Sequence, residues 1–387
     1  MNIYRKMSPF IVLTVLFSFI SSFDESKNVP VVDQIKVEGG YISGIVNSAG
    51  DIHIYKGIPF AAPPIGYLRW KAPQAVQSWN GTKVCDRYSA SPMQAKPAPF
   101  SMWSEEFMIP KEPISEDCLY LNVWTGATNK TEKRPVIIWI YGGAFSSGGT
   151  AVPIYDGEAM AKKGIVFVSI NYRVGIFGFF AHPGLTRESG MHSSGNYGLM
   201  DQIAGIKWVK KNIAAFGGDP DNITIAGQSA GSMSVNILEA SPLAKNLFQK
   251  AIAESGASIV PGVFGNVTLQ MAEKDGEKTA EGLRASSLSE LRKISAEELM
   301  KAEQAIRGPI MDGYVLPESV NNIFMQGKEN KVSLLTGWNE EEGILFTPFK
   351  TADEFKEEAG KTYGTDANTF LQYYPATTDS IAAISQL

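Results

Sequence analysis

The sequence predicts an α/β fold: a mostly parallel central sheet with helices on both faces and an antiparallel edge near the N-terminus. From Arg134 onward, unbroken apolar runs of strand length alternate with segments long enough for helices. The runs occupy residues 135–140, 164–172, 222–227 and 332–337. Such runs indicate strands buried on both faces, as in parallel sheets. Before them, residues 34–66 alternate apolar and polar positions between glycines and prolines, which is typical of antiparallel strands joined by turns.

Helix signals lie between these runs. In the segment 199–216 apolar residues recur on one side of a helix, and Gly217 with Gly218 ends it. The recurring residues are Ile203, Ile206, Val209 and Ile213. Ser287 and Ser295 each precede a glutamate by three positions, so we expect them to begin helices as capping boxes.

Composition limits the class of protein. The chain has 387 residues, of which 44% are hydrophobic and 19% charged, so it can bury a large core. Its length suits two or three domains, but no linker or repeat divides it, and we treat residues 28–387 as one domain. The net charge is −5 and the basic residues are scattered, which argues against a nucleic-acid partner. No metal or cofactor is indicated.

The N-terminus predicts a signal peptide over residues 1–22. Arg5 and Lys6 precede an apolar run at residues 10–20, and that run is shorter than the ~20 residues a membrane helix needs. We therefore expect a secreted or periplasmic protein without a stable membrane span after cleavage; a membrane anchor is the alternative. In an oxidising compartment the two cysteines, Cys85 and Cys118, predict one disulfide, with two buried free thiols as the alternative.

The strongest chemical signal is the pattern G-x-S-x-G at residues 227–231. It follows the strand-like run 222–227 and precedes a helix-like segment, and small residues flank the hydroxyl of Ser229. A tight strand-to-helix turn of this kind projects a nucleophile and leaves backbone N–H groups at the helix start. The alternative is a chance match without chemistry, which this context disfavours.

A second loop fits the same chemistry. The run 135–140 leads into Tyr141-Gly142-Gly143-Ala144, where small residues let backbone N–H groups approach a substrate carbonyl. Alone it could be an ordinary glycine-rich turn. Together with Ser229 it predicts an α/β-hydrolase.

Longer stretches resemble the type-B carboxylesterase and cholinesterase family. Residues 216–231, FGGDPDNITIAGQSAG, resemble its serine signature, and residues 116–123, EDCLYLNV, resemble its second signature. Further similar stretches follow in the family's order, from about Gly40 to about Phe346: GIPFAAPPIGYLRW, SINYRVGIFGF, GNYGLMDQ, MDGYVLP and GWNEEEG.

The resemblance implies roles for individual residues. Ser229 would be the nucleophile, and the N–H groups of Gly143, Ala144 and Ala230 would form the oxyanion hole. Glu342 would be the acid of the triad, because Gly337–Gly343 matches the family's G-x-N-x-x-E-G pattern. Glu340 and Glu341 are then surface charges.

Other positions also match the family. Ser255 resembles a supporting hydroxyl, Arg69 and Glu116 resemble a structural ion pair, and Cys85 and Cys118 correspond to the family's first disulfide. Two residues depart from the commonest pattern: Tyr141 replaces a histidine, and Ala144 replaces a third glycine. Neither departure removes a backbone donor.

The base of a serine triad is missing from the pattern. The three histidines, His53, His182 and His192, all precede Ser229, whereas α/β-hydrolases place the histidine after the acid. The resemblance implies a longer chain, so we expect this one to be C-terminally truncated, with part of its sheet missing and negligible turnover.

The sequence thus predicts a serine carboxylic ester hydrolase that acts on a small-molecule ester through an acyl-enzyme. The alternatives are a non-catalytic, cholinesterase-like binding or adhesion protein and a non-functional gene remnant. The intact Ser229 argues against the binding protein.

Overall fold

The computed structural model describes residues 34–100, 103–259, 267–302, 308–340, 342 and 349–386. The signal peptide predicted over residues 1–22 lies outside this part of the chain. Among the described helices, none has the length and apolar character needed to cross a membrane.

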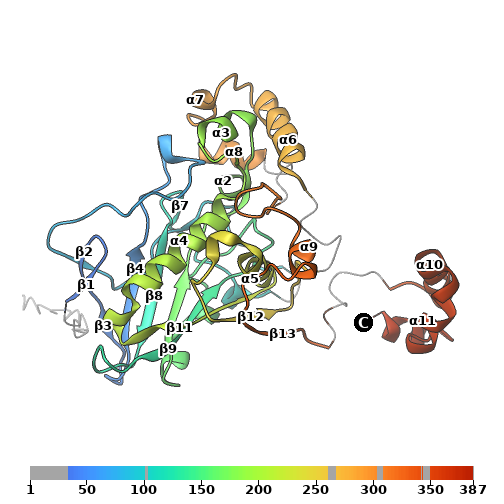
Figure 1. The fold of residues 1–387 in the computed structure, drawn as a ribbon, viewed down its shortest axis with the longest axis horizontal. Helices are drawn as coiled ribbons and strands as arrows, with labels where there is room; N and C mark the ends of the chain where they lie inside the picture. Colours follow the sequence, from blue (N-terminus) through green and yellow to red (C-terminus); the bar gives the residue numbers. More distant parts are fainter. Residues whose placement is uncertain are drawn as a thin grey trace, which may run out of the picture.

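An eight-stranded sheet forms the centre of the molecule, in the order β13-β12-β11-β9-β10-β8-β4-β3 (Figure 1). The five strands from β13 to β10 are parallel, and β8, β4 and β3 continue the sheet with antiparallel pairing. The predicted α/β-hydrolase fold with an antiparallel N-terminal edge is confirmed. The bounds are β3 Ile45–Val46, β4 His53–Pro59, β8 Tyr120–Thr125, β9 Arg134–Ile140, β10 Val166–Ile170, β11 Gly218–Gln228, β12 Lys250–Glu254 and β13 Ser333–Gly337.

Two small sheets accompany the large one. One has the order β1-β2-β5, and the other pairs β6 with β7. Their bounds are β1 Ile35–Val37, β2 Gly40–Ser43, β5 Thr82–Val84, β6 Ser91–Pro92 and β7 Ile114–Ser115.

Helices cover both faces of the large sheet. Strand β9 shows this by its alternation, because Val136, Ile138 and Ile140 lie in the large core while Ile137 and Trp139 pack against a smaller cluster. Helices α4 and α5 contact β11, and α1 contacts β10 and β8. The bounds are α1 Glu158–Ala161, α2 Gly175–Phe179, α3 Pro183–Glu188, α4 Tyr197–Asn212, α5 Ala230–Ala240, α6 Leu269–Gly282, α7 Leu288–Leu291, α8 Ala296–Lys301, α9 Val320–Met325, α10 Ala352–Tyr363, α11 Ala367–Tyr373 and α12 Asp379–Ser385.

Helix α4 confirms the predicted helix within residues 199–216. Its predicted apolar stripe is buried, and a short 3-10 turn continues it to Phe216. Gly217 then adopts a φ of 78°, which ends the helix as predicted. Ser287 and Ser295 begin α7 and α8, and each hydroxyl accepts a hydrogen bond from the backbone N–H three residues on.

Strand β13 differs from the expectation. The run 332–337 was predicted to be buried on both faces, but all five residues of β13 are exposed. The reason is its position: β13 is an edge strand that pairs only with β12 among the described strands. An apolar run alone therefore does not distinguish a central strand from an edge strand.

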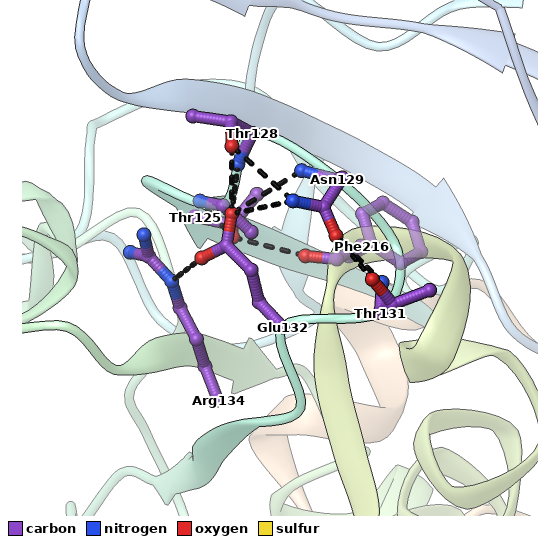
Figure 2. A network of polar contacts seen from close by, with 8 residues as sticks. Thr125, Thr128, Asn129, Thr131, Glu132, Arg134 and Phe216 are labelled. Atoms are coloured by element: carbon purple, nitrogen blue, oxygen red, sulfur yellow. Dashed lines mark hydrogen bonds and ion pairs between the residues drawn. The ribbon is translucent and has the colours of Figure 1, made fainter.

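The turn between β8 and β9 is held by one carboxylate, Glu132 (Figure 2). One of its oxygens accepts hydrogen bonds from the Thr128 N–H at 2.6 Å and the Thr128 hydroxyl at 2.8 Å, and the other accepts from Arg134 Nε at 2.6 Å. Chiefly through the Thr128 N–H bond, these contacts lower the pKa of Glu132 to about 2.

We expect Glu132→Gln to lower the melting temperature near neutral pH, because an amide cannot accept all of these bonds. A carboxylate with a depressed pKa stabilises the fold above its unfolded-state pKa, and that contribution is lost as the pH falls towards about 2. The difference in melting temperature between wild type and variant should therefore shrink steadily below pH 4.5, the ordinary value for a glutamate. Glu340→Gln, at an exposed glutamate, is the control; a pH-independent difference for Glu132→Gln would contradict the prediction.

Candidate active site

Ser229 lies at the turn between β11 and α5. Its backbone has φ 57° and ψ −122°, a conformation that L-residues rarely adopt and that is typical of strained functional turns. Two backbone hydrogen bonds hold it: its N–H donates to the Glu254 carbonyl at 2.9 Å, and its carbonyl accepts from the Met233 N–H at 2.9 Å. The side chain is half-buried, and its hydroxyl makes no hydrogen bond to any described residue. The hydroxyl is therefore available for chemistry.

Glycines make this turn possible, as the sequence predicted. A Cβ at Gly231 would lie 2.1 Å from the Ile140 carbonyl oxygen, and one at Gly227 would lie 2.5 Å from the carbonyl carbon of Gly231. A Cβ at Gly256 would lie 2.5 Å from the carbonyl oxygen of Ser229. The start of α5 thus packs directly onto the ends of β9 and β11, which leaves no room for side chains.

The loop after β9 lies beside Ser229. A Cβ at Gly142 would be 3.1 Å from the Cβ of Ser229, so the two backbones are in close contact. Gly143, Ala144 and Phe145 have φ of 111°, 53° and 61° in succession. In the described part of the chain the N–H groups of Gly143 and Ala144 donate to no acceptor. Ala230 is the first residue of α5, where backbone N–H groups also lack partners within the helix.

The direction of the Ala144 N–H follows from its own peptide group. The Gly143 carbonyl points into the loop, where it accepts hydrogen bonds from the N–H groups of Ser146 and Ser147, both at 3.0 Å. In a trans peptide the carbonyl and the next N–H point in opposite directions. The Ala144 N–H is therefore directed out of the loop.

Two tyrosines anchor the beginning of this loop. The Tyr141 hydroxyl donates to the Tyr172 carbonyl and the Tyr172 hydroxyl donates to the Tyr141 carbonyl, each at 2.8 Å. Their rings stack with centroids 4.3 Å apart. Burial raises the pKa of both phenols, so they remain neutral hydrogen-bond donors. The tyrosine that departs from the family's commonest pattern thus has a structural partner, Tyr172, which the sequence did not reveal.

Glu342 is linked to the same strand ends. Its Oε1 accepts hydrogen bonds from the Ser255 hydroxyl, from the Asn339 N–H at 2.9 Å and from the Asn339 side chain at 2.8 Å. Ser255 directly follows Glu254, whose carbonyl binds the N–H of Ser229. The structure thus brings Glu342 and Ser229 to the same end of the sheet, after β13 and β11, with Ser255 following the strand β12 that lies between these two. It gives Ser255 the supporting contact that the resemblance implied, and it adds Asn339.

These contacts keep Glu342 ionised. Partial burial raises the pKa of its carboxyl, but the hydrogen bonds from Ser255 and Asn339 outweigh burial and leave the pKa below the ordinary value. Its second oxygen accepts no hydrogen bond from the described residues. An ionised carboxylate with one unused oxygen is suited to orient a base. Glu340 is exposed, as predicted, while Glu341 lies outside the described residues.

None of the three histidines hydrogen-bonds to Ser229. His53 pairs with Thr125 of β8, which lies level with Val136 near the start of β9 and with Ile223 in the middle of β11. Ser229 follows the far end of β11, about 20 Å away along the strand direction. His182 begins α3, where its Nδ1 accepts a hydrogen bond from the Gly184 N–H at 3.0 Å, and His192 is exposed.

The predicted disulfide is wrong. Cys85 and Cys118 are both free and buried. The Cys85 thiol lies 4.0 Å from the Gly57 carbonyl oxygen, and burial raises its pKa to about 12. The reasoning from compartment and cysteine number carried no information on the distance between the two sulfur atoms.

The predicted ion pair is confirmed. Arg69 Nε donates to Glu116 at 2.7 Å, and Nη1 of the same arginine donates to the Ile294 carbonyl at 2.8 Å. The pair therefore connects the segment before β8 to the segment between α7 and α8.

Fold and site together define an α/β-hydrolase, with a strained serine between a strand and a helix, beside a loop in which the N–H groups of Gly143 and Ala144 have no acceptor among the described residues. The chain belongs to the carboxylesterase family, which it matches over residues 31–384. It is 39% identical over 365 residues to fumonisin B1 esterase of Sphingopyxis macrogoltabida, covering 90% of this chain and 64% of the relative. It is 38% identical to para-nitrobenzyl esterase of Bacillus subtilis, covering 81% of this chain and 63% of the relative.

Solved structures give the same result. A structure titled PNB esterase superposes with a TM-score of 0.76 at 32% sequence identity, covering 91% of this chain and 73% of the other. By contrast, the chain spans less than two thirds of the length of the two esterases compared by sequence above.

Proposed function

We propose that this chain carries the nucleophile, the acid and the oxyanion-binding groups of a serine carboxylic ester hydrolase. The observation that carries the proposal is that the N–H groups of Gly143 and Ala144, in a loop that contacts Ser229, donate to none of the residues that the structure describes. Membership of the carboxylesterase family supports it, and so do the relatives whose names describe them as esterases.

In the proposed reaction the Ser229 Oγ attacks the carbonyl carbon of an ester, and a base takes the hydroxyl proton. The carbonyl oxygen becomes an oxyanion, stabilised by the N–H groups of Gly143, Ala144 and Ala230. Collapse of this intermediate breaks the bond to the alcohol, which leaves with the proton from the base. Water, activated by the same base, then attacks the acyl-serine, releases the acid and restores the hydroxyl.

The role of Glu342 is to hold that base in one tautomer and to stabilise its charged form. None of the three histidines hydrogen-bonds to Ser229, so these 387 residues place no imidazole on its hydroxyl. Loss of the histidine from a serine triad lowers kcat about a millionfold, or ~8 kcal/mol. We therefore expect negligible hydrolysis of p-nitrophenyl butyrate by the purified 387-residue protein in plain buffer.

Imidazole added to the buffer provides the test, because it can act as the missing base. We expect imidazole to speed up p-nitrophenol release beyond its own reaction in buffer, and mass spectrometry to find the butyryl group on the peptide that contains Ser229. Ser229→Ala, measured at the same imidazole concentrations, supplies the background. Equal rates for wild type and Ser229→Ala would reject the esterase proposal and favour the binding protein, and rapid hydrolysis without imidazole would show that the chain has its own base.

A further inference from the structure

We propose that Gln94 is a positioning residue for the oxyanion-binding loop, an inference that rests on the esterase function proposed above. Gln94 lies in the segment between the two cysteines and is buried, with 5% of its surface exposed. Its side chain reaches across to Gly148 at the end of the loop that begins with Tyr141. The same amide group both donates to and accepts from this one residue.

The contact has the geometry of a pair of backbone hydrogen bonds. Gln94 Nε2 donates to the Gly148 carbonyl at 2.7 Å, and the Gly148 N–H donates to Gln94 Oε1 at 2.8 Å. Nε2 also donates to the Pro92 carbonyl at 2.9 Å, which fixes the amide in one orientation. Since both ends of the amide are used, no other side chain of similar size can replace it fully.

Gly148 connects Gln94 to the amides beside Ser229, because it packs against the beginning of the same loop. Its φ is 111°, and a Cβ there would lie 2.5 Å from the Tyr141 ring and 2.6 Å from the Gly142 carbonyl oxygen. The end of the loop is therefore packed against its beginning. Gly143 is held in turn, because its carbonyl accepts from Ser146 and Ser147.

The loop is thus held at both ends, while the N–H groups of Gly143 and Ala144 donate to no acceptor in the described part of the chain. The two-tyrosine contact holds Tyr141, and Gln94 holds Gly148; beyond it, Asn171 Oδ1 accepts from the Thr150 N–H at 2.9 Å. An oxyanion hole stabilises charge only when its donors are oriented before the reaction. Without Gln94 the middle of the loop loses one of its two anchors.

The first arm of the test compares Gln94→Ala with wild type in the imidazole-assisted acylation of Ser229 by p-nitrophenyl butyrate. We expect the acylation rate at saturating ester to fall about 10- to 100-fold, as for a donor displaced by a fraction of an ångström to one ångström. The ester concentration at half-saturation should change little, because the loop binds the transition state more strongly than the ester.

Asn212→Ala is the matched control. Asn212 is also a buried amide that joins two segments, accepting from the Glu38 N–H at 2.9 Å and donating to the Trp208 carbonyl at 2.8 Å. It lies six residues before β11, at the opposite end of that strand from Ser229. We expect Asn212→Ala to lower the stability of the protein without slowing acylation. If both variants acylate equally slowly, Gln94 contributes only to the stability of the fold and does not position the loop.

The second arm uses Gln94→Glu. An ionised carboxylate repels the Gly148 carbonyl, whereas a protonated carboxyl can donate to it as the amide does. The ratio of the variant's acylation rate to that of wild type should therefore rise towards one as the pH is lowered. A ratio that does not change with pH would contradict the hydrogen-bonding role.

Hydrogen–deuterium exchange separates the failure of this inference from the failure of the esterase proposal. We expect peptides that span residues 141–150 to exchange faster in Gln94→Ala than in wild type and in Asn212→Ala. If wild type does not acylate at all, the esterase proposal fails and the exchange result alone decides whether Gln94 holds the loop. Unchanged exchange, or unchanged acylation in Gln94→Ala, overturns the inference.

Discussion

Replacing Asp201 by alanine is expected to lower the free energy of unfolding by about 3–5 kcal/mol. Asp201 accepts two hydrogen bonds from the Arg173 guanidinium, both at 2.8 Å, and a third from the Arg173 N–H at 3.0 Å. The side chains are 3% and 0% exposed, so the alanine variant leaves a buried arginine without its counter-ion. Urea denaturation of wild type and variant measures the loss.

Two further variants separate the cause from a general effect of charge removal. Asp86→Ala removes a surface pair with Arg87, which is 84% exposed, and should cost less than about 1 kcal/mol. The double variant Arg173→Met with Asp201→Leu removes both buried charges and should recover much of the stability lost in Asp201→Ala. If Asp201→Ala is no less stable than Asp86→Ala, the buried Arg173–Asp201 pair does not stabilise the fold more than a surface pair does, which contradicts the prediction.

The pair also bears on the candidate site. Arg173 directly follows Tyr172, whose hydroxyl and carbonyl hold Tyr141 at the start of the oxyanion-binding loop. Asp201 of helix α4 therefore holds the segment that contains Arg173 and Tyr172, and Tyr172 in turn holds the oxyanion-binding loop at Tyr141. We expect the exchange of residues 141–150 to increase in Asp201→Ala even at temperatures where the protein is folded.

Gly231→Ala is expected to have the second large effect, a loss of about 3 kcal/mol in the free energy of unfolding. The added methyl would lie 2.1 Å from the Ile140 carbonyl oxygen, a backbone atom that cannot move without displacing β9. The start of α5 would have to shift, and Ser229 would shift with it. We therefore expect a lower melting temperature in thermal denaturation and a slower imidazole-assisted acylation of Ser229.

Gly282→Ala is the control for this substitution. Gly282 is the last residue of α6, and a Cβ there would meet no heavy atom within 4 Å. Alanine favours a helix over glycine, so this variant should be as stable as wild type or slightly more stable. A Gly231→Ala protein with the stability of Gly282→Ala would show that α5 does not pack as tightly against β9 as described.

The sequence predicted those features that depend on local backbone geometry. The turn at Ser229 requires glycines at fixed positions, and α4 with the 3-10 turn after it requires an apolar periodicity followed by Gly217, so both are visible in a short stretch of residues. By contrast, nothing in the run 332–337 distinguished an exposed edge strand from a buried one, because that difference depends on neighbours elsewhere in the chain.

Apart from the Arg69–Glu116 pair, which the family resemblance implied, the contacts between distant segments described above were not predicted. Tyr172 lies 31 residues from Tyr141 and Gln94 lies 54 residues from Gly148, and each is an ordinary residue in its own segment. The disulfide prediction failed for a related reason. The number of cysteines and the expected compartment favoured a disulfide, but both cysteines are free in the folded chain. Only a three-dimensional arrangement shows which polar groups meet.

The central claim is that the backbone amides of two loops face the hydroxyl of Ser229. Its most direct test is to soak crystals of the 387-residue protein with an alkyl boronic acid, which forms a tetrahedral adduct with an accessible serine, and to solve the structure. We predict boron bonded to the Ser229 Oγ, with one boronate oxygen about 2.7–3.1 Å from the backbone nitrogens of Gly143, Ala144 and Ala230. An adduct whose oxygens point away from those amides, or no adduct at Ser229 at all, would contradict the account.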